Sequence, residues 1–181
     1  MSVIELPTFA TAEDLFSETG EGDWFLLRTR SRQEKIVAAD LTARGVSSFL
    51  PLSTHVRYYG GHKEIVDLPI FPGYVFLRGT PQDAYSLDRN GRVAQIIAIA
   101  NQRQVNWELS NIHFALCNDV PLCKYQYLKK GVRVEVRSGP LRGLQGIIEC
   151  RAKRDRLILQ VEILGTAVSL EVDGALLDVL D

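Results

Sequence analysis

The sequence has few cysteines, no long apolar run and almost no net charge. Its three cysteines, Cys117, Cys123 and Cys150, are an odd number and match no metal-ligand spacing. We therefore expect reduced thiols in a cytoplasmic protein, with neither a disulfide framework nor a metal site. No stretch approaches the roughly 18 apolar residues of a membrane helix. The N-terminus has neither the basic start nor the apolar core of a signal peptide, so we expect no contact with a membrane.

The sequence also lacks the residue patterns of an enzyme. Its three histidines, His55, His62 and His113, are far apart, and no serine, cysteine or aspartate forms a catalytic arrangement with them. No glycine-rich loop opens a helix in the way that a phosphate-binding site requires. We therefore expect a binding protein that has no enzymatic activity and needs no cofactor.

The net charge of −1 hides an acidic start and a mildly basic body. Residues 1–22 contain five acidic residues and no basic one, and they end in a glycine-rich break. We expect this segment to be a flexible leader with at most a short helix. Residues 23–115 contain 11 Lys or Arg against 8 Asp or Glu. This excess is too small for a protein that wraps nucleic acid alone, but it permits assisted contact.

Strand and helix patterns alternate along residues 23–116. Residues 24–30 have the composition of a strand, and Ser31 followed by Glu34 matches a capping box. The serine oxygen of such a box caps the helix start, and Gly45 suits the position just after the helix end. The first units of this region are therefore a strand followed by a helix of about three turns.

Turn and cap residues divide the remainder of this region. The pair Gly60-Gly61 between two β-type runs predicts a hairpin. Thr80 before a proline predicts a second helix, closed by Gly91, and Asn106 predicts the cap of a third. The resulting order β-α-β-β-β-α-β-α predicts an α/β sandwich, in which helices pack on a mainly antiparallel sheet.

The pattern changes to β structure alone after residues 117–127, which we interpret as a linker. Residues 128–181 contain five short alternating runs separated by glycine-rich turns. Five strands in about 50 residues predict a small β-barrel, because closure removes exposed strand edges. The whole chain is thus predicted to be an α+β protein with two domains.

Two segments carry a family resemblance. The first is Pro-Ile-Phe-Pro-Gly-Tyr-Val-Phe-Leu at residues 69–77, about 45 residues after the Trp-Phe-Leu-Leu strand. The second combines Gly-Val-Arg-Val at residues 131–134 with Ser-Gly-Pro-Leu-Arg-Gly-Leu-Gln-Gly at residues 138–146. In this order, the pair resembles the NusG-like transcription elongation and antitermination factors. The likeness runs from about Trp24 to Leu180.

The resemblance implies both a fold and a function. Members of this family have an N-terminal NGN domain, here residues 23–116, and a C-terminal SH3-like KOW domain, here residues 128–181. The NGN domain binds the clamp helices of RNA polymerase and favours processive elongation. The KOW domain recruits a second partner, which is termination factor Rho or a small-subunit ribosomal protein. The resemblance also implies a monomer that performs no covalent chemistry.

By resemblance, Tyr74 and Phe76, with Phe71 beside them, belong to the apolar patch that receives the clamp helices. Residues two apart on a strand point to the same face, and aromatic anchors dominate interface energetics. The alternative is that both aromatic side chains belong to the core of the domain.

A basic segment lies where family members face the non-template DNA strand. Arg28 and Arg30 are two apart at a strand end, so we expect them to share a face that tracks phosphates. The alternative is a solvated charged rim. The full candidate set comprises Arg28, Arg30, Arg32, Gln33 and Lys35.

The second domain has its own candidate residues. Glycines and a proline enable the corner, Arg142 is displayed on it for RNA phosphate, and a short loop resembles the family's partner-binding loop. General members have Phe-Gly-Arg in that loop, whereas this chain has Leu-Gly-Thr. The change favours a specialised paralogue over a general NusG factor. A ribosome- or RNA-binding KOW protein that never meets polymerase is the other alternative. These candidate residues are Gly139, Pro140, Arg142, Gly143, Gly146, Leu164 and Thr166.

Overall fold

The computed structural model describes residues 12–18, 20–87, 91–125, 131–149 and 155–180, in two compact units. Unit 1 extends to Arg103 and unit 2 begins at Gln104. Antiparallel sheets and helices make up the chain, so the predicted α+β class is confirmed. Among the helices of the described residues, none is both long and apolar enough to span a membrane.

Unit 1 is built on a four-stranded antiparallel sheet with the order β2-β5-β1-β6. Its strands are β1 (Asp23–Thr29), β2 (Ser47–Phe49), β5 (Tyr74–Gly79) and β6 (Val93–Ala98). Its helices are α1 (Ala12–Phe16), α2 (Glu34–Ala43) and α3 (Pro81–Tyr85). A separate two-stranded sheet pairs β3 (Leu52–Tyr59) with β4 (His62–Pro69). The two-residue turn at Gly60 and Gly61 has positive φ at both positions, as the sequence predicts.

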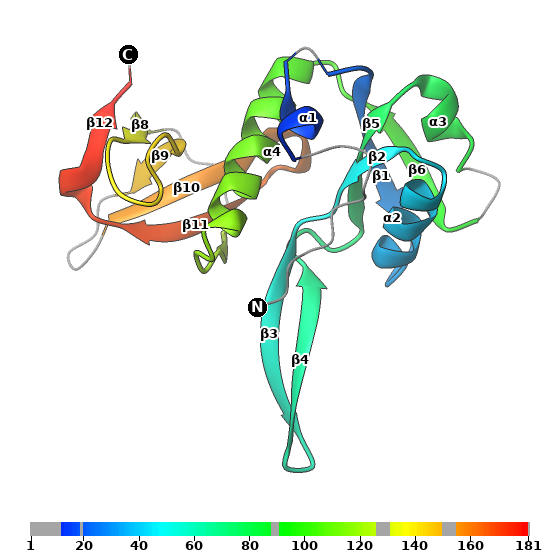
Figure 1. Cartoon of the computed structure of the whole chain (residues 1–181), viewed down its shortest axis with the longest axis horizontal. Helices are drawn as coiled ribbons and strands as arrows, with labels where there is room; N and C mark the ends of the chain where they lie inside the picture. Colours follow the sequence, from blue (N-terminus) through cyan, green and yellow to red (C-terminus); the bar gives the residue numbers. More distant parts are fainter. Residues whose placement is uncertain (1–11, 19, 88–90, 126–130, 150–154, 181) are drawn as a thin grey trace. The chain divides into compact units, whose positions relative to one another are not determined.

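The helices α2 and α3 lie on one face of the four-stranded sheet (Figure 1). Strand alternation directs Phe25 and Leu27 of β1 to that face, where they pack with Val37 and Leu41 of α2 and with Leu77 of β5. Thr80 caps α3, as predicted, and forms a complete capping box with Asp83. Nevertheless α3 ends at Tyr85, well before Gly91, so the predicted extent of this helix is wrong.

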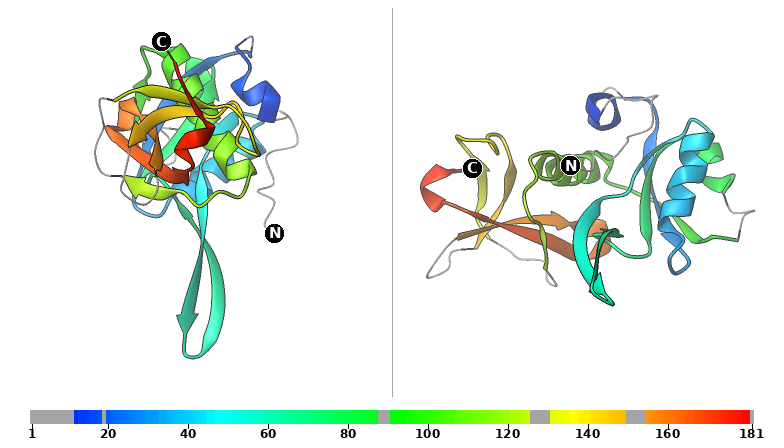
Figure 2. Two further views of the ribbon diagram at one scale, coloured as in Figure 1. Left: turned by 90° about the vertical axis from the view of Figure 1, so that its left-hand side faces the viewer. Right: turned by 60° about the horizontal axis from the view of Figure 1, so that its bottom comes forward.

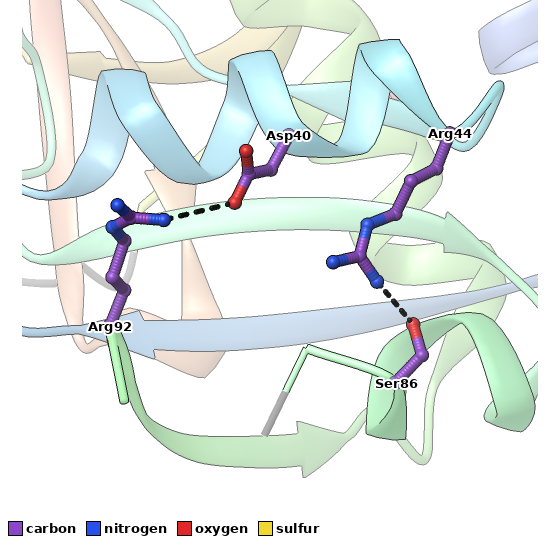
Figure 3. Close-up of polar contacts among 4 residues, drawn as sticks. All are labelled: Asp40, Arg44, Ser86 and Arg92. Atoms are coloured by element: carbon purple, nitrogen blue, oxygen red, sulfur yellow. Dashed lines mark hydrogen bonds and ion pairs between the residues drawn. The ribbon is translucent and has the colours of Figure 1, made fainter. Parts of the chain in front are cut away.

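Two polar side-chain contacts connect α2 to neighbouring segments of unit 1 (Figure 3). Arg92, just before β6, forms an ion pair of 3.3 Å with Asp40 of α2. Arg44, at the end of α2, donates a hydrogen bond of 3.1 Å to the hydroxyl of Ser86, at the end of α3. The hydrogen bond is exposed and the ion pair is only partly buried, so both orient α2 more than they stabilise the unit.

Residues 12–18 and 20–22, the described part of the expected flexible leader, contact the sheet, and residues 1–11 and 19 lie outside the described residues. The Phe16 ring of α1 stacks on Trp24 at 5.8 Å between centroids and meets Phe49 edge-on at 5.3 Å. The guanidinium of Arg78 lies over the Trp24 ring and donates to the backbone oxygens of Leu15 and Gly20. A buried cation therefore fixes this segment to β5, through backbone acceptors that the sequence does not reveal.

Unit 2 contains most of α4 (Gln102–Cys117) and a six-stranded antiparallel sheet with the order β12-β8-β9-β10-β11-β7. The strands are β7 (Cys123–Tyr125), β8 (Arg133–Val136), β9 (Gln145–Glu149), β10 (Asp155–Val161), β11 (Thr166–Val172) and β12 (Leu177–Val179). The short 3-10 helices are η2 (Glu162–Leu164) and η3 (Gly174–Leu176). Five of the strands are those predicted, and the sheet is consistent with an SH3-like domain.

Two sequence predictions in this part of the chain differ from the structure. The strand β7, which pairs with β11, lies inside the segment interpreted as a linker. The helix α4 begins at Gln102, so Asn106 lies inside the helix and does not cap it. The side-chain amide of Gln102 donates to the backbone oxygens of Trp24 and Ile99, and its oxygen accepts from the Trp24 amide. The two long-range bonds to Trp24 hold the helix start in a place that local cap signals do not indicate.

Candidate functional site

The structure brings the two N-terminal motifs together at one end of the β1–β5 pair. Arg28 of the basic segment is the direct cross-strand partner of Tyr74, at the start of β5. The Thr29 amide donates a 2.8 Å hydrogen bond to the Gly73 oxygen. Directly opposite residues of an antiparallel pair share a face, so the Arg28 and Tyr74 side chains are neighbours. Sequence analysis treated them as parts of two different sites.

Glu34, the first residue of α2, stabilises this end of the sheet through a hydrogen bond. Its carboxylate is buried and accepts a 2.7 Å hydrogen bond from the Gly73 amide. Gly73 has φ +88, a left-handed conformation that places its amide toward α2. Glu34 is thus a positioning residue that fixes the turn from which Tyr74 begins its strand.

The capping box predicted at Ser31 is wrong. Arg32 has φ +59, which turns the chain away from a helical path and leaves Ser31 outside α2. Gln33 occupies the cap position without a side-chain hydrogen bond. The Glu34 carboxylate accepts a hydrogen bond from the amide of Gly73, 39 residues away. The local pattern had indicated a capping box with Ser31 as its partner.

The basic side chains of the candidate DNA-binding segment are exposed. Arg28, Arg30, Arg32 and Lys35 are open to solvent, and Gln33 is half-buried. None of the four cations has an ion-pair partner among the residues that the structure describes. The strand ends at Thr29, between Arg28 and Arg30, so their shared face stays a prediction.

The three candidate aromatic residues differ in exposure. Phe76 is 0% exposed and lies beside Leu26 and Phe49 in the neighbouring strands. Phe71 is 4% exposed, whereas Tyr74 is half-buried. Tyr74 is therefore the member of the set whose ring is open to a partner, and the two phenylalanines support the strand that presents it.

The candidate residues of unit 2 lie at two turns. Gly139 and Gly143 have φ values of +85 and +89 at the corner between β8 and β9, where Pro140 and Arg142 are exposed. A side chain at Gly146 would lie 2.7 Å from the Ile158 backbone oxygen, so only glycine fits against β10. Leu164 ends η2 and Thr166 begins β11, on either side of the left-handed Gly165, and both are half-buried.

A cavity of about 320 Å³ lies within unit 2, between α4 and the strands β8, β9 and β10. The Trp107 indole donates a 3.0 Å hydrogen bond to Gln145, and Arg133 lies over its ring. The buried Glu108 carboxylate accepts from the Glu162 amide at 3.1 Å and from the Gln104 side chain at 2.9 Å. No sequence motif marks this cavity, because its walls come from four separate segments between Gln104 and Glu162.

Burial raises the pKa of Glu108, against the opposing effects of its hydrogen bonds from Gln104 and Glu162 and of the Arg133 charge. A carboxyl with a higher pKa in the folded state stabilises the fold while protonated, and this stabilisation is lost as pH rises through that pKa. We therefore expect Glu108→Gln to raise the melting temperature of the full chain at about pH 8, with a smaller gain at about pH 5. Glu108→Ala should instead cost about 1–3 kcal/mol, because the Glu162 amide loses its acceptor. A wild type as stable as Glu108→Gln at both pH values contradicts this expectation.

Metal binding finds no support in the described residues. No group of three or more His, Cys, Asp or Glu side chains among them is placed to hold an ion. Cys117 and Cys123 are free and exposed, and Cys150 lies outside the described residues.

Comparison with known proteins identifies a family whose model matches the region of this site. The family model described as transcription termination factor NusG matches residues 22–110, which include the Arg28–Tyr74 surface. No curated protein sequence is significantly similar to the chain. Among solved structures, a chain of the MjSpt4:Spt5 complex in conformation B is 18% identical, with 87% of this chain and 97% of that chain covered. The TM-score of that superposition is 0.31, a value that does not establish a shared arrangement.

Proposed function

Because this chain is a NusG-like protein with the kind of function that transcription elongation factors have, we propose that it works by binding RNA polymerase through unit 1. The observation that carries the proposal is the pairing of Arg28 with Tyr74 inside the matched region. It places a partly exposed aromatic ring next to a group of unpaired cations. Such a surface suits a protein anchor and a nucleic-acid strand that lie side by side.

In this proposal Tyr74 contacts the clamp helices of the polymerase, and Phe71 and Phe76 hold its strand in place. The basic residues from Arg28 to Lys35, with Gln33, face the non-template DNA strand. Bridging polymerase and DNA in this way favours processive elongation and antitermination without any covalent chemistry. The protein acts in the cytoplasm as a monomer and has no enzymatic activity.

Unit 2 recruits a second partner in this proposal, namely Rho or a small-subunit ribosomal protein. The loop at Leu164 and Thr166 has neither the aromatic nor the basic residue found in general members of the family. This difference favours a specialised paralogue that acts on selected operons. A general NusG factor and a ribosome- or RNA-binding KOW protein are the alternatives, and the assay below separates the RNA-binding protein from the proposal.

An elongation assay tests the proposed function. Stalled complexes of purified core RNA polymerase are restarted with the full chain, with Tyr74→Ala, or with Tyr85→Ala. Tyr85 lies on α3 and is 57% exposed, so it is a matched surface control. We expect the wild type and Tyr85→Ala to shorten pauses equally and Tyr74→Ala to have little effect. A folded wild type that leaves pausing unchanged contradicts the proposal and favours the RNA-binding alternative.

A further inference from the structure

The β3–β4 hairpin extends away from the four-stranded sheet of its own unit (Figures 1 and 2). Its strands pair over their whole length, from Leu52 with Pro69 to Tyr59 with His62. Every residue from 54 to 65 is exposed. An isolated two-stranded hairpin is only marginally stable in water, so a long exposed ribbon of this kind suggests an element that meets a partner.

The tip of this hairpin combines aromatic and cationic side chains. Tyr58 and Tyr59 are 75% and 84% exposed, and as neighbours on a strand they point to opposite faces of the ribbon. Arg57 precedes them, and His62 and Lys63 follow the turn. No Asp or Glu occurs between residues 55 and 63. The tip therefore has a positive charge although the chain as a whole is slightly negative.

The strand register places a basic residue beside each tyrosine. Tyr58 lies opposite Lys63, and Tyr59 lies opposite His62. Opposite residues share a face and lie about 5 Å apart at Cβ, so each ring has a basic neighbour on its own side. Arg57 lies two residues before Tyr59 and shares its face. Arg57 also lies directly opposite Glu64, but neither Arg57 nor Lys63 forms an ion pair among the described residues.

Aromatic rings beside free cations are the combination with which proteins hold single-stranded nucleic acid. Bases stack on the rings, and the cations contact the flanking phosphates. Stacking on an exposed ring requires an unpaired base, which distinguishes a single strand from a duplex. We propose that the hairpin tip, residues 57–63, binds single-stranded nucleic acid through Tyr58 and Tyr59, with Arg57 and Lys63 on the phosphates.

An apolar protein partner is the competing occupant. Val56 and Ile65 lie opposite each other and are exposed on the face that also holds Tyr58. A protein groove would use that apolar face alone. The tip instead has an aromatic ring with a basic neighbour on each of its two faces. The positive charge of these basic residues favours a strand that carries phosphates. The proposal needs no polymerase, and it concerns a surface other than the segment from Arg28 to Lys35.

The test is fluorescence anisotropy of the full chain with labelled oligonucleotides of mixed sequence and about 20 nucleotides. Single-stranded DNA, single-stranded RNA and the DNA duplex are compared. We expect the wild type to bind the single strands more tightly than the duplex. Tyr58→Ala/Tyr59→Ala should weaken single-strand binding at least about 30-fold, because two stacked bases lose their rings. Tyr58→Phe/Tyr59→Phe retains the rings and should bind like the wild type.

Salt dependence tests the cations separately. Two phosphate contacts to a single strand predict a loss of about sevenfold in affinity when salt rises from about 50 to about 200 mM. Arg57→Gln/Lys63→Gln should weaken binding and remove most of this salt dependence. Val56→Ser/Ile65→Ser, on the same hairpin, and Tyr85→Ala, on α3, should bind like the wild type.

Several results overturn the inference. Absence of single-strand binding by the folded wild type does so, and so does equal affinity for the duplex. If Tyr58→Ala/Tyr59→Ala binds like the wild type while Arg28→Gln/Lys35→Gln does not, the strand binds elsewhere on unit 1. If no oligonucleotide binds but the tyrosine variant loses affinity for RNA polymerase, the hairpin is a protein-docking element. Because polymerase is absent from the anisotropy assay, failure of the proposed function leaves its outcome unchanged.

Discussion

Replacing Leu41 with alanine is expected to lower the free energy of unfolding of unit 1 by about 2–5 kcal/mol. Leu41 is fully buried in α2 and packs in the core that Leu27, Val75 and Leu77 form on the sheet. The substitution removes apolar contacts and leaves a cavity that the surrounding strands fill only in part. Such a loss is a large fraction of the stability of a domain of this size.

Ile36 on the same helix is the matched control. It is 43% exposed, so Ile36→Ala should change the free energy of unfolding by no more than about 0.5 kcal/mol. Hydrogen exchange of the β1 amides in the full chain reports on unit 1 separately from unit 2. Equal effects of the two substitutions would show that α2 does not cover the sheet with the face described.

Glu34→Ala is expected to destabilise unit 1 by about 1.5–3 kcal/mol, because it removes a hydrogen bond to a charged acceptor. The Gly73 amide loses its carboxylate partner, and the turn that precedes Tyr74 loses its connection to α2. The specific readout is the exchange rate of the Gly73 amide, which should rise more than the rates of the amides in α3.

Glu34→Gln retains an oxygen acceptor without the charge, and it should restore part of the protection at Gly73. A purely structural role of the helix start would affect α2 amides and leave Gly73 protected. Full protection of the Gly73 amide in Glu34→Ala would therefore contradict the positioning role of Glu34.

Local patterns predicted those elements whose signals lie within a few residues. The Gly60-Gly61 turn and the Thr80 cap are both confirmed, because two-residue hairpin turns and capping boxes are determined by adjacent residues. Alternation likewise predicted the strands of the four-stranded sheet and five strands of unit 2. The α+β class follows from their order along the chain.

Predictions failed where a partner distant in sequence determines the structure. Ser31 and Glu34 match a capping box. However, the left-handed conformation of Arg32 leaves Ser31 outside the helix, and the Glu34 carboxylate accepts from the Gly73 amide. The start of α4 is held by Gln102 on the backbone of Trp24, 78 positions away. The cavity beside Glu108 is likewise assembled from distant segments, which no local pattern indicates.

The candidate site, too, was predictable where local residues determine it and unpredictable where distant residues do. Its residue types were recognised from the sequence, but the adjacency of Arg28 and Tyr74 depends on the register of β1 and β5. Alternation placed Tyr74 and Phe76 on one face without showing that Phe76 is fully buried. The basic and aromatic residues of the hairpin tip, from 55 to 63, are visible in the sequence, but only the structure shows that they are exposed on an extended ribbon.

The central claim is that unit 1 binds RNA polymerase through the surface that presents Tyr74. The most direct measurement is the affinity of the full chain for purified core RNA polymerase, with Tyr74→Ala and Tyr85→Ala measured alongside. Phe76 is left intact because its loss would disturb the fold. We expect the wild type and Tyr85→Ala to bind alike and Tyr74→Ala to bind about 30-fold more weakly, the loss typical of an anchoring aromatic residue. No binding by the folded wild type, or equal binding by folded Tyr74→Ala, would contradict the claim.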